Sequence, residues 1–289
     1  MGKARVRFTL LDAALFVLIL AAGAYLVRRI GGEMDYRWQW PVIFGYLVRP
    51  DGGSWVAGSL AQGFLTTIKL SLWATLLASI LGVVMGIMRV SRHLFRRLIA
   101  GSYVELVRNL PPLVLVFIVY FFIGERIMTA FGVEELIRSA SPETQSVLAA
   151  IFVPPARLPG FFAGLATLVL YEAAYITEIV RAGIESIEKG QWEAAHALGL
   201  SRRQQLLDVI LPQALRRILP ALAGQIISTI KDSAIVSVIS IPELTFQGLE
   251  IMSATYLTFE VWITITILYF VLTFGVSLGV RRLENAWRY

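Results

Sequence analysis

The sequence predicts an all-α integral membrane protein with six transmembrane helices. Three observations support this prediction: long apolar runs, few charged residues, and basic residues gathered at the ends of those runs. Of the 289 residues, 57% are hydrophobic and only 16% are charged, whereas soluble domains carry about 25% charged residues. The mean hydropathy is +0.70. Much of the chain is therefore expected to face lipid rather than water.

Six segments are long enough to cross a bilayer. The hydrocarbon core is about 30 Å thick and a helix rises about 1.5 Å per residue, so roughly 20 apolar residues are needed. The alternating units of about ten residues that indicate a membrane β-barrel do not occur in the sequence. The predicted spans are Leu10–Val27, Leu60–Met88, Tyr103–Ile123, Phe161–Val180, Ile218–Ile239 and Thr258–Val280.

The first segment has two interpretations. Lys3, Arg5 and Arg7 precede its apolar stretch and the small residues Ala22–Ala24 follow it, as in a cleavable signal peptide. The apolar run continues past these small residues to Val27, which favours an uncleaved helix.

The distribution of basic residues predicts the orientation. With the N-terminus inside, 17 of the 26 lysines and arginines fall on the cytoplasmic side and 7 outside, while Lys69 and Lys231 lie within spans. This bias follows the positive-inside rule, so both termini are predicted to be cytoplasmic. Outside, residues 124–160 include an apolar stretch near Val147–Val153 that predicts a short helix or lid, and Pro242–Leu257 is expected to form a turn.

The composition excludes several other functions. A net charge of +6 is compatible with nucleic-acid binding, but the charges cluster at the ends of apolar runs, which instead indicates contact with lipid. There is no cysteine, and His93 and His196 have no partners in a metal-binding pattern. We expect no catalytic site, metal or cofactor, and no nucleic-acid partner.

The polar segment Gln191–Pro212 carries the most specific pattern. Its residues QWEAAHALGLSRRQQLLDVILP predict a short helix that Gly199 stops. Ser201 then begins a second helix, with Gln204 at capping-box spacing, and this helix is expected to end before Pro212. Composition alone is equally compatible with an ordinary cytosolic loop that packs on its own subunit.

The spacing within this segment resembles the EAA loop of ABC importer permeases, with Val209 where isoleucine is usual. The matching residues are Glu193, Ala194, Ala195, Gly199, Val209, Leu211 and Pro212. The resemblance implies a type I importer permease fold whose core covers residues 58–282, with the loop at 191–212. Residues 1–57 would add an N-terminal helix and an external segment, and 283–289 a cytoplasmic tail. It also implies that Glu193, Ala194, Ala195 and Gly199 form a coupling helix that docks on an ATP-binding subunit.

Four other stretches look like the polar amino acid branch of this family: Arg108–Pro112, Ala173–Gly183, Lys189–Gln191 and Lys231–Ser233. The resemblance therefore implies a permease of the bacterial cytoplasmic membrane that translocates polar amino acids by alternating access. The implied partners are two ATP-binding subunits, a second permease of the same or a related kind, an external solute-binding protein, the amino acid and membrane lipid. Which amino acid is carried does not follow from the sequence.

Charged residues within the spans suggest a substrate path, because such residues are costly in lipid and usually face a cavity or the bundle interior. Glu172, Lys231 and Asp232 supply the anions and the cation that an amino acid zwitterion requires. Equally, Glu172 and Lys231 could form a structural ion pair. Glu178 and Arg181, three residues apart on one helix, are expected to form a structural or gating pair.

Two further patterns concern the helices themselves. The prolines of Arg108–Pro112 are expected to break a helix. Gly82 and Gly86 match a small-xxx-small face for close helix packing.

Other transport mechanisms remain alternatives to this interpretation. The sequence contains no G-x-x-x-x-G-K-[ST] motif, so any ATPase must be a separate polypeptide. An ion-coupled secondary transporter would usually show paired interrupted segments in two halves, and these are not evident. A channel or a membrane anchor for a complex is the third alternative. Transport without ATP would favour one of these.

Overall fold

The computed structural model describes residues 9–33, 36–124, 126, 130 and 132–287. The chain divides into two compact units, with the boundary between Phe44 and Gly45. The smaller unit contains α1 (Leu10–Glu33) and the first part of α2 (Trp40–Leu47). All remaining elements belong to the larger unit.

The larger unit is almost entirely helical, as the sequence predicts. A small antiparallel hairpin of β1 (Val48–Asp51) and β2 (Ser54–Ala57), which the sequence did not predict, precedes its first long helix. The helical elements are α3 (Ser59–Arg89), α4 (Leu94–Asn109), α5 (Pro112–Ile118), η1 (Val119–Gly124), α7 (Val133–Ser139), α8 (Pro142–Ile151), η2 (Pro155–Arg157), α9 (Leu158–Glu185), α10 (Lys189–Ala197), α11 (Arg202–Gln204), η3 (Gln205–Ile210), α12 (Leu211–Asp232), η4 (Ser233–Ile239), α13 (Leu244–Thr255) and α14 (Thr258–Trp287).

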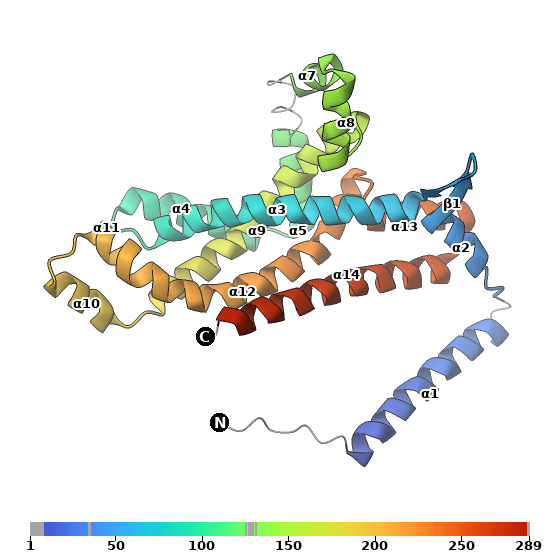
Figure 1. Cartoon of the computed structure of the whole chain (residues 1–289), viewed down its shortest axis with the longest axis horizontal. Coiled ribbons are helices and arrows are strands. Elements are labelled where there is room, and N and C mark those ends of the chain that lie inside the picture. The colour runs from blue at the N-terminus through green and yellow to red at the C-terminus, as the bar shows by residue number, and fades with distance from the viewer. Residues whose placement is uncertain (1–8, 34–35, 125, 127–129, 131, 288–289) are drawn as a thin grey trace. The chain divides into compact units, whose positions relative to one another are not determined.

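The long helices α3, α9, α12 and α14 lie along one another and form a bundle (Figure 1). α10 and α11 lie at one end of this bundle, and β1 and α13 lie at the other (Figure 1). The polar segment predicted to be cytoplasmic and two of the segments predicted to be external are therefore at opposite ends of the larger unit.

α3 and α9 make the most extensive helix–helix contact, and glycines allow it. A Cβ on Gly82 would lie 2.5 Å from Cγ2 of Ile176, and a Cβ on Gly86 would lie 2.6 Å from Cβ of Val180. Both distances are too short for any side chain, so the helices approach this closely only because the two glycines share one face of α3. The predicted small-xxx-small packing face is confirmed.

The predicted third span is not one straight helix. α4 ends at Asn109, Leu110 adopts an extended conformation, and α5 begins at Pro112 with its axis bent by 115° from that of α4. Each proline lacks a backbone donor, and the residue before a proline avoids helical geometry. The predicted break is confirmed, and the segment predicted as the third span consists of two helices joined at this bend.

The helix that begins after Ser201 does not end before Pro212, contrary to the sequence prediction. α11, η3 and α12 follow one another without interruption, so helical backbone extends from Arg202 to Ile239. η3 is a π-helix in which the Leu211 N–H bonds to the Leu206 carbonyl. Its wider turn directly precedes Pro212, which lacks an N–H and sits in the first turn of α12.

The predicted turn at Pro242–Leu257 is also wrong, because this segment contains the 12-residue helix α13. Glu243 is fully buried and caps it: Oε1 accepts a hydrogen bond from the Phe246 backbone at 2.8 Å. The Tyr269 hydroxyl donates to Oε2 at 2.9 Å, which ties the cap to α14. By contrast, the short helix predicted near Val147–Val153 is confirmed as α8.

Four helical segments among the described residues are long and apolar enough to cross a membrane: Ser59–Arg89, Pro155–Glu185, Arg202–Ile239 and Thr258–Arg282. The count becomes five when the bent pair α4 and α5 is taken as one span. α1 covers the predicted first span, but its apolar stretch, Leu10–Tyr25, is shorter than these. The structure thus gives four or five spans, and the sixth stays a prediction. Residues 283–287, predicted as tail, continue α14.

Candidate functional site

The short helix predicted before Gly199 is present as α10. It is closed by Gly199, whose φ of +74° lies in the left-handed region that favours glycine. The Gly199 N–H bonds to the His196 carbonyl at 2.9 Å, and the Leu200 N–H bonds to the Ala195 carbonyl at 3.2 Å. These two bonds form a Schellman motif, which satisfies carbonyls at the end of the helix. Gly199 therefore stops α10 as the sequence predicts.

The second half of this segment begins with the predicted cap. The Ser201 side chain accepts a hydrogen bond from the Gln204 N–H, and the Gln204 side chain accepts one from the Ser201 N–H at 2.9 Å. This reciprocal capping box is confirmed. We refer to residues 189–204, which comprise α10, its closing turn and α11, as the coupling hairpin.

The coupling hairpin exposes both polar and apolar side chains to solvent. Glu193 and Ala194 are exposed, whereas Ala195 is buried against the rest of the chain. Leu198 is 79% exposed, and the sequence analysis did not single it out. The signal that could have identified it is a large apolar side chain within an otherwise polar segment. Leu198 follows Ala194 by four residues, which places both on the same side of the helix.

Contacts across the hairpin hold α10 against the start of the long helix. The Arg202 guanidinium lies over the Trp192 ring, 5.4 Å from its centre, and so joins α11 to α10. The Gln213 side chain donates to Oε1 of Gln191 at 3.1 Å. Trp192 also packs on a hydrophobic cluster formed by α9, η3 and α12. The hairpin is therefore attached to the bundle on both sides of its turn.

The second predicted site lies inside the bundle, around Glu172. This carboxylate is fully buried on α9, and its Oε2 accepts a hydrogen bond from Nε2 of Gln225 on α12 at 2.6 Å. Oε1 is also buried and has no hydrogen-bond partner among the described residues. A buried carboxylate oxygen without a partner is costly, so the surroundings of Glu172 are a candidate site for contact with a ligand.

The two other pathway candidates lie on the helix opposite Glu172. Asp232, at the end of α12, is partly buried and close enough to interact electrostatically with Glu172. Lys231 is exposed, and no ion pair joins it to Glu172 in the part of the chain that the structure describes. Gln225, which the sequence analysis missed, occupies the position that a structural partner of Glu172 would take. It lies seven residues before Asp232, on the same face of α12.

Glu178 and Arg181 form the expected ion pair on α9. Arg181 also pairs with Glu185, and Arg89 of α3 lies 3.6 Å from Glu178. The charges therefore connect the ends of two neighbouring helices, consistent with a structural or gating pair. The Arg108 guanidinium of α4 lies over the ring of Tyr175 of α9, 5.4 Å from the ring centre.

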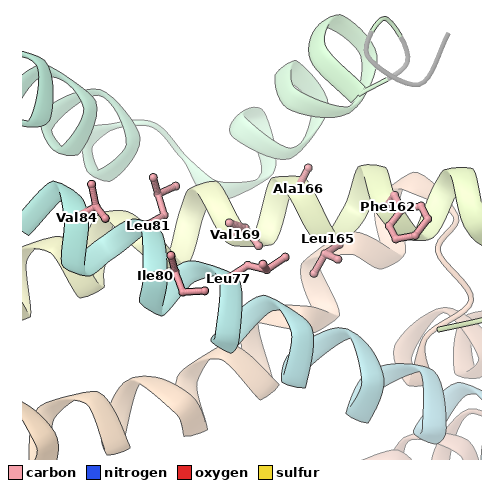
Figure 2. Close-up of a pocket in the computed structure, with 8 residues that line it drawn as sticks. All are labelled: Leu77, Ile80, Leu81, Val84, Phe162, Leu165, Ala166 and Val169. Atoms are coloured by element: carbon pink, nitrogen blue, oxygen red, sulfur yellow. The ribbon is translucent and has the colours of Figure 1, made fainter. Parts of the chain in front are cut away.

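A groove of about 670 Å³ lies between α3 and α9, but its chemistry does not suit an amino acid (Figure 2). Only apolar side chains line it: Leu77, Ile80, Leu81, Val84, Phe162, Leu165, Ala166 and Val169. A zwitterion needs charged or hydrogen-bonding partners for both of its ends. The polar cluster around Glu172 is thus the better candidate for a substrate path.

Comparison with known proteins agrees with this fold. Residues 78–289 match the family described as "Binding-protein-dependent transport system inner membrane component". The chain is 33% identical over 224 residues to the probable glutamine ABC transporter permease protein GlnM of Bacillus subtilis strain 168, covering 78% of this chain and 91% of that protein. It is 34% identical over 221 residues to the glutamine transport system permease protein GlnP of Escherichia coli strain K12, covering 75% and 89% respectively.

Solved structures show the same architecture. One described as "Crystal structure of an amino acid ABC transporter with histidines" matches with a TM-score of 0.62 and 33% identity, covering 79% of this chain and 94% of that one. An inward-facing structure of the MetNI methionine ABC transporter shares the fold, with a TM-score of 0.58 at 19% identity, covering 79% and 95%. The chain therefore belongs to the inner membrane components of binding-protein-dependent transport systems, the permease subunits that ABC importers combine with ATP-binding subunits and a substrate-binding protein.

Proposed function

We propose that this permease translocates polar amino acids by alternating access, and that α10 couples the movement to ATP hydrolysis on a separate subunit. The named relatives act on glutamine and other amino acids, which supports this class of substrate. The observation that carries the proposal is an exposed short helix, closed by Gly199, at the start of a helix that continues into the bundle.

The coupling role is assigned to Glu193, Ala194, Ala195 and Gly199. Glu193 and Ala194 face solvent and are available to a partner, whereas Ala195 packs inward and seats the helix. Small side chains allow a partner helix or cleft to approach closely, and the Glu193 carboxylate can pair with a partner cation. Gly199 contributes the backbone geometry that ends the helix.

The substrate path is assigned to the polar cluster around Glu172. The unpartnered Oε1 of Glu172 and the nearby Asp232 carboxylate would accept hydrogen bonds from the ammonium group of an amino acid. Lys231 would serve the α-carboxylate only in an assembly that covers its exposed side chain. A second permease packed on this face of α12 would provide such a cover.

The full assembly would contain two such permeases, identical or related, with two ATP-binding subunits and an external solute-binding protein. Both termini would lie in the cytoplasm. The positive-inside distribution of basic residues supports this orientation, because it places the coupling hairpin on the side where ATP is present.

Charge reversal at Glu193 tests the coupling assignment. In proteoliposomes containing the assembled importer, Glu193→Lys should abolish ATP-dependent amino acid uptake while membrane insertion stays normal, because the exposed carboxylate would meet its partner with the wrong charge. Glu188→Lys is the matched control: Glu188 is exposed nearby, and its side chain makes no capping bond.

The control variant should retain uptake. Unchanged transport by Glu193→Lys would remove the coupling assignment. Uptake by the wild-type permease without an ATPase would instead favour an ion-coupled secondary transporter.

A further inference from the structure

The side chain of Gln205 lies buried at the base of the coupling hairpin. It is only 1% exposed, and its Nε2 donates a hydrogen bond to the Leu200 carbonyl at 2.7 Å. The same nitrogen lies 3.5 Å from Nδ1 of His196. Oε1 of Gln205 is buried without a hydrogen-bond partner in the described part of the chain. A buried amide oxygen without a partner is costly, so the position of this side chain requires an explanation.

Gln205 stands at the junction of two structural elements. It is the first residue of η3, which continues through α12 into the bundle, whereas Leu200 belongs to the turn that closes α10. The Leu200 N–H in turn bonds to the Ala195 carbonyl at 3.2 Å. A chain of hydrogen bonds therefore leads from the interior of α10, through its closing turn, to the first turn of the π-helix.

The other polar links between the hairpin and the long helix are more exposed. Gln191 and Gln213 meet at the surface, where water competes for both amides. The bond from Gln205 to Leu200 is part-buried and its donor side chain is almost fully buried, so water competes less for it. The adjacent segment η3 is a π-helix, and π-helical turns are places where a helix can change register. The bond from Gln205 to Leu200 would oppose such a change.

We propose that Gln205 is the positioning residue that makes the coupling hairpin and α12 move as one body. Displacement of α10 by an ATP-binding subunit would then reach the substrate path instead of being absorbed in the Gly199–Leu200 turn. This inference rests on the proposed coupling function of α10, and it adds the residue on which transmission depends. Gln205 contacts neither substrate nor nucleotide.

Gln205→Met is the primary test, because methionine fills a similar volume but cannot donate to the Leu200 carbonyl. In proteoliposomes with the complete importer, ATP hydrolysis should persist while the number of amino acids taken up per ATP falls about fivefold, the order expected for losing one buried hydrogen bond. Leu207→Met places the same residue at an exposed position of the same π-helical segment without removing a polar group, and should leave this ratio unchanged.

A distance measurement separates transmission from simple destabilisation. The chain has no cysteine, so cysteines at the exposed positions Ala197 and Leu215 can be spin-labelled specifically. Wild type should show one narrow distance between α10 and α12, and Gln205→Met a broad distribution. A narrow distribution together with a normal uptake ratio would overturn the proposal.

A second variant keeps the proposal testable if Gln205→Met does not assemble. In the double variant His196→Cys and Gln205→Cys, a short bifunctional thiol reagent would replace the missing contact by a covalent link. Bridging should restore the ratio of uptake to ATP hydrolysis, and full coupling before bridging would contradict the proposal. If even wild type hydrolyses ATP without uptake, the proposed function fails; if wild type couples and Gln205→Met couples equally well, only the role of Gln205 fails.

Discussion

Two residues at predicted functional positions, Gly199 and Glu172, have unusual local environments. Gly199 adopts a φ of +74° in the turn that closes α10, and an L-residue in left-handed geometry costs about 1–2 kcal/mol. Glu172 buries a carboxylate with one oxygen unpartnered.

Gly199→Ala should therefore weaken the end of α10. We expect a loss of about 1–2 kcal/mol in the free energy of unfolding of this region, from the left-handed backbone alone. Hydrogen exchange of the hairpin amides measures it. Gly190→Ala is the control, because Gly190 is helical and a Cβ there meets nothing within 4 Å. Equal hydrogen-exchange rates of the hairpin amides in the two variants would contradict the cost expected for alanine at position 199.

Glu172→Gln tests the substrate path while preserving side-chain shape. The neutral amide can still contact Gln225, but an ammonium group would lose a charge-assisted partner, which is worth about 1.5–3 kcal/mol. Uptake should fall by at least about tenfold with normal ATPase assembly. Glu250→Gln, at an exposed position on α13, should have no effect. Wild-type uptake by Glu172→Gln would leave Glu172 as a structural residue.

At the scale of elements, the contact between α3 and α9 determines how closely the bundle packs. Gly82→Leu would place a side chain where its Cβ already lies 2.5 Å from Ile176 and 3.1 Å from the Ala173 carbonyl. Overpacking of this kind costs about 1–3 kcal/mol or more, so thermal unfolding in detergent should occur at a clearly lower temperature. Gly275→Leu on α14 is the control, because nothing lies within 4 Å of its Cβ. Similar unfolding temperatures for the two variants would contradict the close contact between α3 and α9 at Gly82.

At the scale of the molecule, the opposite ends of the bundle are expected to face different compartments. α10 lies at one end and the β1–β2 hairpin at the other (Figure 1). Because the chain has no cysteine, single cysteines at Ala197 and Gly52 can report their side of the membrane. A membrane-impermeant maleimide applied to intact cells, with the outer membrane permeabilised where one is present, should label Gly52→Cys but not Ala197→Cys. Labelling of Ala197→Cys would place α10 outside and contradict the orientation.

The membrane class, the long helices and the coupling hairpin could all be predicted from the amino-acid sequence. These features depend on local properties: apolar length, the left-handed preference at Gly199 and the capping box of Ser201 and Gln204. They can be predicted from the sequence because each one is specified by residues close together in the chain.

The tertiary structure alone decided which distant residues meet. It placed Gln225 rather than Lys231 against Glu172, let the helix continue past Pro212, and formed α13 around the buried Glu243. These outcomes depend on packing between helices and on desolvation of polar groups, which act between residues far apart in sequence. No local pattern specifies such partners, because the free energy that selects them arises only once the helices pack together.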